Sequence, residues 1–357
     1  MFLVAFALAA SLAPDYQRQP LASRRCARPI AAWTQLQAAK PKEEKPPGAL
    51  PLAYRACGLA TTAAWTKIVL TTIKSNAPQG MMMPSAQHGP FARMGCFAVV
   101  PLLYSTYSTL ASASKESWEQ LGSPACRRLN LALVAAGLGS ALWVGFAPTI
   151  TAIPGTNPVA SHAGWIADAG MTRTALIGAY GATAALSAAV WARSLPEDAR
   201  KKPLSWPGRV VDGVSKSLVT LAPANVNDPV NVKYSLLSTS FLVLTALQLG
   251  SHPLSVVPSW TGRRLARAYP AWTLLAAASS INLKEAAENG KLLVDSTYRS
   301  LSNGLTAFGA IYLASKTGSV LLDPSFPDSY HAVKMVPTWA AAGAAMIGLT
   351  LRPDKAE

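Results

Sequence analysis

Long stretches without any charged residue limit the possible folds of this 357-residue chain more than any other feature. Only 14% of the residues are charged and 50% are apolar, whereas soluble domains carry about a quarter charged residues. A helix that crosses a bilayer needs about 20 predominantly apolar residues. The composition therefore predicts an integral membrane protein and argues against a soluble enzyme or a disordered chain.

Eight segments with few or no charges are predicted to be membrane-spanning helices. They are 56–73, 94–114, 129–146, 174–192, 234–250, 268–283, 300–315 and 335–351. Lys67 is the one Asp, Glu, Lys, Arg or His residue inside them. The predicted fold is all-α, a polytopic membrane helix bundle of eight transmembrane helices in four hairpins, with six helices as the alternative.

Lys and Arg are unevenly distributed between these segments. They are frequent before the first span and in the connections 193–233 and 284–299, and scarcer in the alternate connections, apart from a cluster at 263–267. Because basic connections stay on one side of a membrane, an even number of spans must precede Arg127. The two upstream segments, 56–73 and 94–114, therefore either both span or neither does, and both are predicted to span although 56–73 contains Lys67.

The chain divides into four predicted regions. They are a cleavable signal plus transit peptide (1–39), a Pro- and charge-rich tether (40–51), the transmembrane helical domain (52–351) and a polar tail (352–357). Within 193–233, Val210, Val214 and Leu218 recur at helical spacing. This spacing predicts an amphipathic helix lying on the basic side of the membrane, with a surface helix bound to a soluble partner as the alternative.

The N-terminus has the composition of a targeting sequence. Residues 1–14 form an apolar run too short to cross a bilayer, and 15–39 are basic and nearly free of acids. The junction Ala10-Ser11-Leu12-Ala13-Pro14 partly matches an Ala-Ser-Ala-Phe-Ala-Pro-like cleavage motif, with Leu in place of Phe. These features resemble the bipartite presequence of algae with plastids of secondary endosymbiotic origin.

That resemblance covers the presequence alone and implies a plastid membrane, either the thylakoid or the inner envelope. A secretory-pathway membrane is the first alternative, and a mitochondrial or other address is the second. No family resemblance is visible in the mature chain.

Small residues recur at four-residue spacing inside the predicted spans. In lipid, close backbone approach through small side chains supplies the contact between helices. The candidate helix-packing residues are Gly137, Ala141, Gly178, Gly181, Ala182, Ala185, Ala344 and Gly348. They predict faces that bind other helices.

Four histidines fall one in each predicted hairpin loop, on the side poor in Lys and Arg. They are His88, His162, His252 and His331. Because neutral imidazole is a common ligand, joint binding of a metal or a tetrapyrrole is one hypothesis for them. They lack the His-x-x-His or Cys-x-x-Cys spacing of closed metal sites, so four independent interfacial histidines are favoured and no metal or cofactor is predicted.

No catalytic motif is recognisable, so no catalytic residue is predicted. The cysteines Cys57, Cys96 and Cys126 have no paired spacing and indicate inert thiols. The predicted spans also lack the buried charges that proton-coupled transporters use. A non-catalytic auxiliary subunit or assembly factor is therefore favoured over a small-solute transporter or channel, and over a membrane enzyme or cofactor carrier.

The expected partners follow from the predicted location. They are the lipid bilayer and a membrane protein complex, which would be a photosynthetic complex if the membrane is the thylakoid. Nucleic acid is not expected, because much of the net charge of +15 lies in the presequence and in loops that orient the helices.

Overall fold

The computed structural model describes residues 46–74, 95–146, 173–195, 197–219, 221–223, 229–251, 260–289 and 296–322. All regular structure in these ranges is helical, and they contain no strand, which confirms the all-α prediction for this part of the chain. Two of the described helices, Cys96–Glu116 and Thr174–Arg193, are long and apolar enough to cross a membrane.

Long helices occupy the first seven predicted spans. They are α3 (Leu50–Lys74), α5 (Val99–Glu116), α7 (Pro124–Phe146), α9 (Arg173–Arg193), α12 (Pro229–Ser251), α13 (Trp260–Glu288) and α14 (Ser296–Leu322). The short helices are η2 (Gly95–Ala98), α6 (Trp118–Leu121), α10 (Glu197–Arg200) and η3 (Pro203–Ser205). The eighth predicted span, 335–351, lies outside the described residues.

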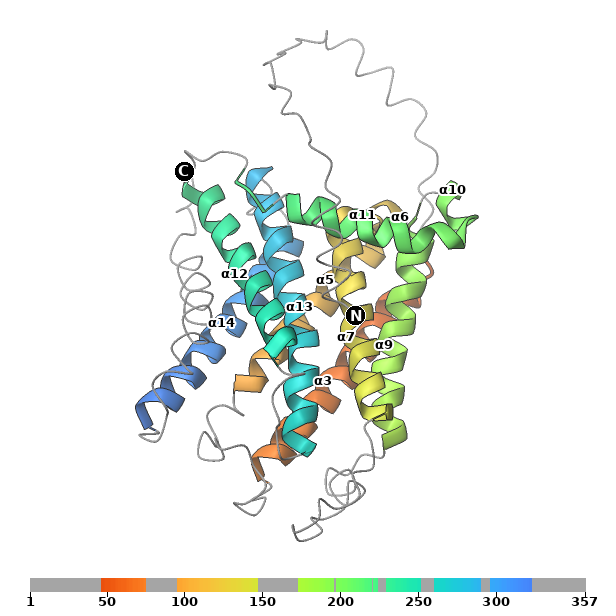
Figure 1. Cartoon of the computed structure of the whole chain (residues 1–357). Coiled ribbons are helices and arrows are strands. Elements are labelled where there is room, and N and C mark those ends of the chain that lie inside the picture. Colours follow the sequence, from red (N-terminus) through yellow and green to blue (C-terminus); the bar gives the residue numbers. More distant parts are fainter. Residues whose placement is uncertain are drawn as a thin grey trace.

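The long helices pack side by side in one bundle (Figure 1). Three pairs of consecutive long helices pack together, α3 on α5, α7 on α9 and α12 on α13. Across these hairpins, α13 packs on α7 and α14 packs on α5. The helices predicted to pair within each of the first three hairpins are therefore in contact.

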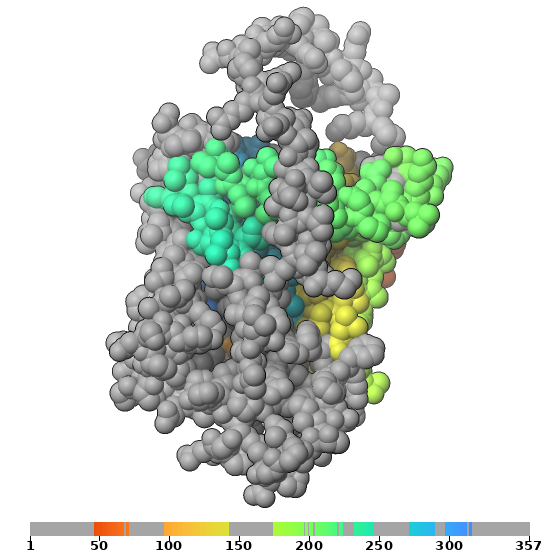
Figure 2. All heavy atoms as spheres, in the orientation of Figure 1, coloured from red at the N-terminus to blue at the C-terminus, as the bar shows by residue number. Residues whose placement is uncertain are grey.

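The amphipathic helix predicted in the basic connection is present as α11 (Trp206–Val219), and it lies across one end of the bundle (Figure 1). Pro207 stands in its first turn, where a missing backbone N–H costs nothing. Trp206 contacts Trp191 of α9 edge to face, with 6.0 Å between ring centroids. Val210 packs on the same small apolar cluster as Trp191 and Leu195. In the space-filling view, α10 and α11 form a surface band above α7 (Figure 2).

Two element boundaries differ from the sequence prediction. The predicted tether is already helical from Leu50, which packs against the core. Helix α13 continues past residue 283 to Glu288, so Lys284 and Glu285 belong to a helix and not to a loop. The uncharged run that defines the predicted span ends at Leu283, but Lys284 pairs with Glu288 one turn later and the helix continues.

The interior of the bundle is an apolar core that also contains many hydroxyl groups, and further large apolar side chains are exposed on its surface. Buried hydroxyl residues include Thr61, Ser105, Thr106, Thr109, Ser114, Ser140, Thr183, Ser187, Ser235, Ser238, Thr245, Thr273, Ser279 and Ser280. Exposed apolar or aromatic residues on the long helices are Leu52, Leu59, Leu70, Tyr104, Leu138, Leu142, Leu236, Val243 and Ile311.

Candidate functional site

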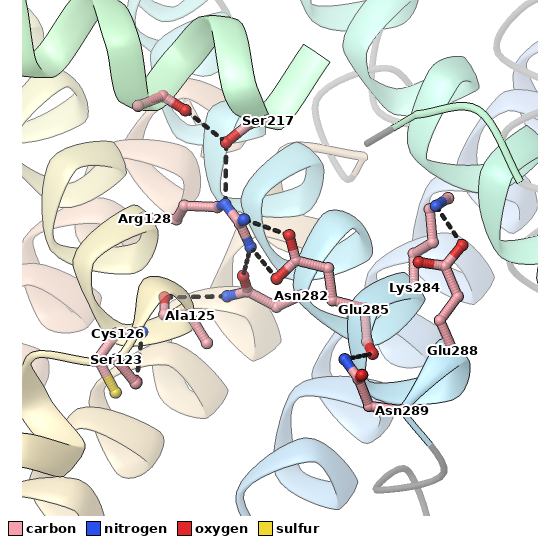
Figure 3. Close-up of polar contacts among 11 residues, drawn as sticks. Ser123, Ala125, Cys126, Arg128, Ser217, Asn282, Lys284, Glu285, Glu288 and Asn289 are labelled. Atoms are coloured by element: carbon pink, nitrogen blue, oxygen red, sulfur yellow. Dashed lines mark hydrogen bonds and ion pairs between the residues drawn. The ribbon is translucent and has the colours of Figure 1, made fainter. Parts of the chain in front are cut away.

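A polar cluster centred on Arg128 joins three helices at the end of the bundle that α11 covers (Figure 3). Arg128 is in the second turn of α7, so its guanidinium lies beneath α11 and beside α13. Its Nε donates to Ser217 Oγ of α11 at 2.9 Å. Its Nη1 donates to Asn282 Oδ1 at 2.9 Å and to Glu285 Oε2 at 2.7 Å, and its Nη2 donates to Glu285 Oε1.

The partners of Arg128 are themselves held by the backbone. Asn282 Nδ2 donates to the Ala125 carbonyl at 3.1 Å, which ties α13 to the start of α7. Ser217 Oγ donates to the Gly213 carbonyl at 2.8 Å and accepts from Arg128, so the Ser217 hydroxyl is held in one orientation. The cluster holds one positive and one negative charge with their hydrogen bonds satisfied. Its chemical role is to fix α11 on α7 and α13.

A second ion pair lies one turn away on α13. The Lys284 side chain is 1% exposed, and its Nζ donates to Glu288 Oε1 at 2.5 Å. A buried ammonium group is costly unless it is paired. Figure 3 shows this pair beside the Arg128 cluster, on the same segment of α13.

Arg127, next to Arg128, connects α7 to the end of α9. Its Nη2 donates to the Ser194 carbonyl at 2.7 Å. Burial and, secondarily, the nearby positive charge of Arg209 lower the pKa of Arg127 from its ordinary value. The guanidinium of Arg193 lies 5.7 Å from the centre of the Trp118 ring, as in a cation–π contact. This end of the bundle is therefore basic and closely packed.

A separate hydroxyl cluster lies deep in the bundle, between α3, α5 and α9. The Thr61 and Thr183 hydroxyls are 2.7 Å apart, and Tyr107 Oη donates to Thr183 Oγ1 at 2.8 Å. Tyr54 Oη donates to Asn130 Oδ1 of α7 at 2.8 Å. These contacts are interhelical hydrogen bonds of the kind that join helices in an apolar solvent.

Three aromatic rings meet at the centre of the bundle. Trp272 of α13 lies 6.2 Å from Trp65 of α3 and 5.8 Å from Tyr180 of α9, between ring centroids. Both Trp272 and Tyr180 are buried, and Trp272 Nε1 and Tyr180 Oη have no hydrogen-bond partner among the described residues. The rings fill the space where α3, α9 and α13 converge.

The predicted packing residues divide into two groups. Gly137 lies at the α7–α9 contact, where a Cβ atom would be 2.8 Å from the Tyr180 carbonyl oxygen. Ala141, one turn on, also packs against the core. Gly178 and Gly181 face open space, with nothing within 4 Å of an added Cβ atom.

Two further packing candidates continue the outward face of α9, because Ala182 and Ala185 are exposed. Ala344 and Gly348 lie outside the described residues. All four loop histidines, His88, His162, His252 and His331, also lie outside the described residues. The hypothesis that they share a metal or a tetrapyrrole therefore stays a prediction.

Among the described residues, no group of three or more His, Cys, Asp and Glu side chains is placed to hold a metal ion. Cys57, Cys96 and Cys126 are thiols.

The sequence prediction missed the Arg128 cluster because it ended the span before Glu285. A signal was present, since Asn282, Glu285 and Asn289 recur at spacings of three and four and share one helix face. The doublet Arg127-Arg128 stands at the start of another predicted span. Opposite charges at span ends on the same side of a membrane are candidates for pairing.

Comparison with known protein families, with characterised proteins and with solved structures finds no match to this chain.

Proposed function

We propose that the chain is a non-catalytic integral membrane protein, an auxiliary subunit or assembly factor that binds neighbouring membrane proteins through exposed helix faces. The observation that carries the proposal is that large apolar side chains are exposed on several long helices in addition to the apolar core. Leu59 of α3, Leu142 of α7 and Leu236 of α12 are all exposed although they lie on different helices. Lipid and partner helices provide the apolar surroundings that such a surface needs.

The face of α9 that points away from the bundle is the proposed partner-binding surface. Gly178, Ala182 and Ala185 share this face, and all three are exposed. A partner helix packed there could approach the α9 backbone closely, which supplies dispersion contact in lipid. The Leu-bearing outer faces of α3 and α7 do not allow so close an approach.

The basic end of the bundle supports an orientation within the membrane. Helix α11 lies across this end with exposed Arg209 and Lys216, and Lys201 and Lys202 precede it. Basic residues are retained on the side of the membrane from which the chain inserts. Lys67 is exposed on the last two turns of α3, from which a flexible Lys side chain reaches the opposite surface.

The plastid address is part of this proposal and depends on the presequence, 1–39, which lies outside the described residues. A thylakoid location would make a photosynthetic complex the natural neighbour. The address is tested by expressing 1–39 fused to a fluorescent protein in an alga with a secondary plastid. Fluorescence confined to the endoplasmic reticulum would favour the secretory alternative.

The function is tested by native solubilisation of membranes that contain the full chain, followed by separation by size. We expect the chain to migrate with a larger complex. In the variant Gly178→Leu/Ala182→Leu, comigration should be lost while the bundle stays folded, because both substitutions point outward.

The matched control is Ala60→Leu/Ala63→Leu, which adds similar volume to exposed positions of α3. The control should leave comigration unchanged. Migration of the wild-type chain as a lone monomer would contradict the proposal and favour the alternative, a small-solute transporter or channel.

A further inference from the structure

A surface pocket of about 400 Å³ lies where α3 begins and α5 ends. Pro46, Pro51, Leu52 and Arg55 line it from the N-terminal side, and Ser114 and Lys115 line it from α5. The short helix α6 connects the end of α5 to the start of α7, where Arg128 lies. The pocket is therefore at the same end of the bundle as Arg128 and α11. The pocket is open to the surface and combines an apolar wall with two cationic side chains.

The charges of the pocket favour an anion. Arg55 and Lys115 are exposed, and neither forms an ion pair with any residue that the structure describes. None of the described residues that line the pocket is acidic, since Glu116 is exposed beside it without contributing to its wall. Ser114 Oγ donates to the Ala111 carbonyl and keeps its acceptor capacity only, so the two cations supply the donors.

The apolar wall continues along α3, away from the pocket. Leu52 is 69% exposed and Leu59 is 73% exposed. They are two turns apart on one helix face, about 10 Å along the axis. A ligand with an anionic head at Arg55 and Lys115 and an apolar tail would therefore find a matching surface below its head.

We propose that this pocket binds the phosphate headgroup of an anionic phospholipid, with an acyl chain lying along Leu52 and Leu59. The inference rests on the proposed membrane location and adds a specific lipid site to it. Arg55 and Lys115 attract the phosphate from the basic side of the membrane, where anionic headgroups meet basic residues at the ends of helices.

The test uses the full chain purified in a neutral detergent, with phosphatidylglycerol as the anionic probe and phosphatidylcholine as the neutral one. Binding is measured by titration of each lipid and by counting retained lipids with native mass spectrometry. In Arg55→Gln/Lys115→Gln, we expect the affinity for phosphatidylglycerol to fall about tenfold, with binding of phosphatidylcholine unchanged.

The matched control is Lys201→Gln/Lys202→Gln, which removes the same charge from exposed positions at the same end of the bundle. The control should keep wild-type affinity for phosphatidylglycerol. An equal loss in both variants would show general electrostatic attraction and overturn the site, as would wild-type affinity in the pocket variant. Equal unfolding temperatures of the two variants establish that a loss of binding is not a loss of fold.

A final arm separates a lipid from a soluble phosphate. Glycerophosphoglycerol, which is the headgroup without acyl chains, should compete at least tenfold more weakly than phosphatidylglycerol. Competition at equal strength would assign the pocket to a soluble phosphate ester and contradict the lipid site. Extraction of the chain from membranes by alkali would instead contradict the proposed function, whichever result the lipid titration gives.

Discussion

Arg128 of α7 and Glu285 of α13 form a bidentate ion pair in which each Nη group donates to one carboxylate oxygen. The same guanidinium binds Ser217 of α11 through Nε. One side chain therefore connects two helices of the bundle to the helix that crosses its end. The pair is mostly shielded from solvent, since the two side chains are 17% and 25% exposed.

Replacing Glu285 by Gln should destabilise the bundle by about 2 kcal/mol, because it leaves a shielded guanidinium without its counter-charge. The measurement is thermal unfolding of the purified chain in detergent. Glu197→Gln is the control, because it breaks the largely exposed pair with Lys201 and should cost less than about 0.5 kcal/mol. Equal losses in the two variants would contradict the role given to the Arg128 cluster.

Gly304 should not tolerate a side chain. A Cβ atom at this position would overlap the Ser105 side chain of α5 and lie 2.9 Å from the Pro101 carbonyl oxygen. Gly304→Ala should therefore destabilise the chain by about 1–3 kcal/mol. Gly178→Ala is the control and should be neutral or stabilising, because its Cβ faces open space. A neutral Gly304→Ala variant would show that α5 and α14 are farther apart than described.

The hydroxyl cluster should contribute to stability through coupled hydrogen bonds. Thr183→Val keeps the shape of the side chain and removes the group that Tyr107 and Thr61 contact. We expect a loss of about 1 kcal/mol, within the range for interhelical hydrogen bonds in membrane proteins. A double-mutant cycle with Tyr107→Phe should show positive coupling. Tyr104→Phe on the exposed face of α5 is the control, and purely additive effects in the cycle would argue against the contact.

Lys202 and His252 should lie on opposite sides of the membrane, because α12 (Pro229–Ser251) separates them. The test places one cysteine at either position in a chain whose own cysteines are replaced, and labels sealed vesicles with an impermeant maleimide. In sealed vesicles only one of the two cysteines should react, and the other should react only after the membrane is permeabilised. Equal reaction of both sites in sealed vesicles would contradict this topology.

Much of the helical framework could be predicted from the sequence, because long runs without charged residues directly indicate apolar helices. The segment 174–192, for example, became α9 (Arg173–Arg193) with almost the predicted ends. Helix α11 could also be predicted, since Val210, Val214 and Leu218 recur at helical spacing. Both cases rest on local patterns, which do not depend on how the helices later pack.

The candidate site could not be predicted in the same way, because its residues meet only through tertiary packing. Glu285 follows an uncharged run and falls in the predicted connection 284–299, whereas in the structure it lies in a helix and pairs with Arg128. Small-residue spacing likewise identified both Gly137, which packs inside, and Gly178, which faces out. The spacing marks a face that permits close approach, but only the neighbouring helices decide whether another part of the chain occupies it.

Extraction of membranes with alkaline carbonate tests the central claim most directly, since it removes peripheral proteins and leaves spanning helices in the lipid. The account predicts that the processed chain stays in the membrane pellet together with a known integral protein. Recovery of the chain in the aqueous fraction would contradict it, because its exposed leucines would then face water.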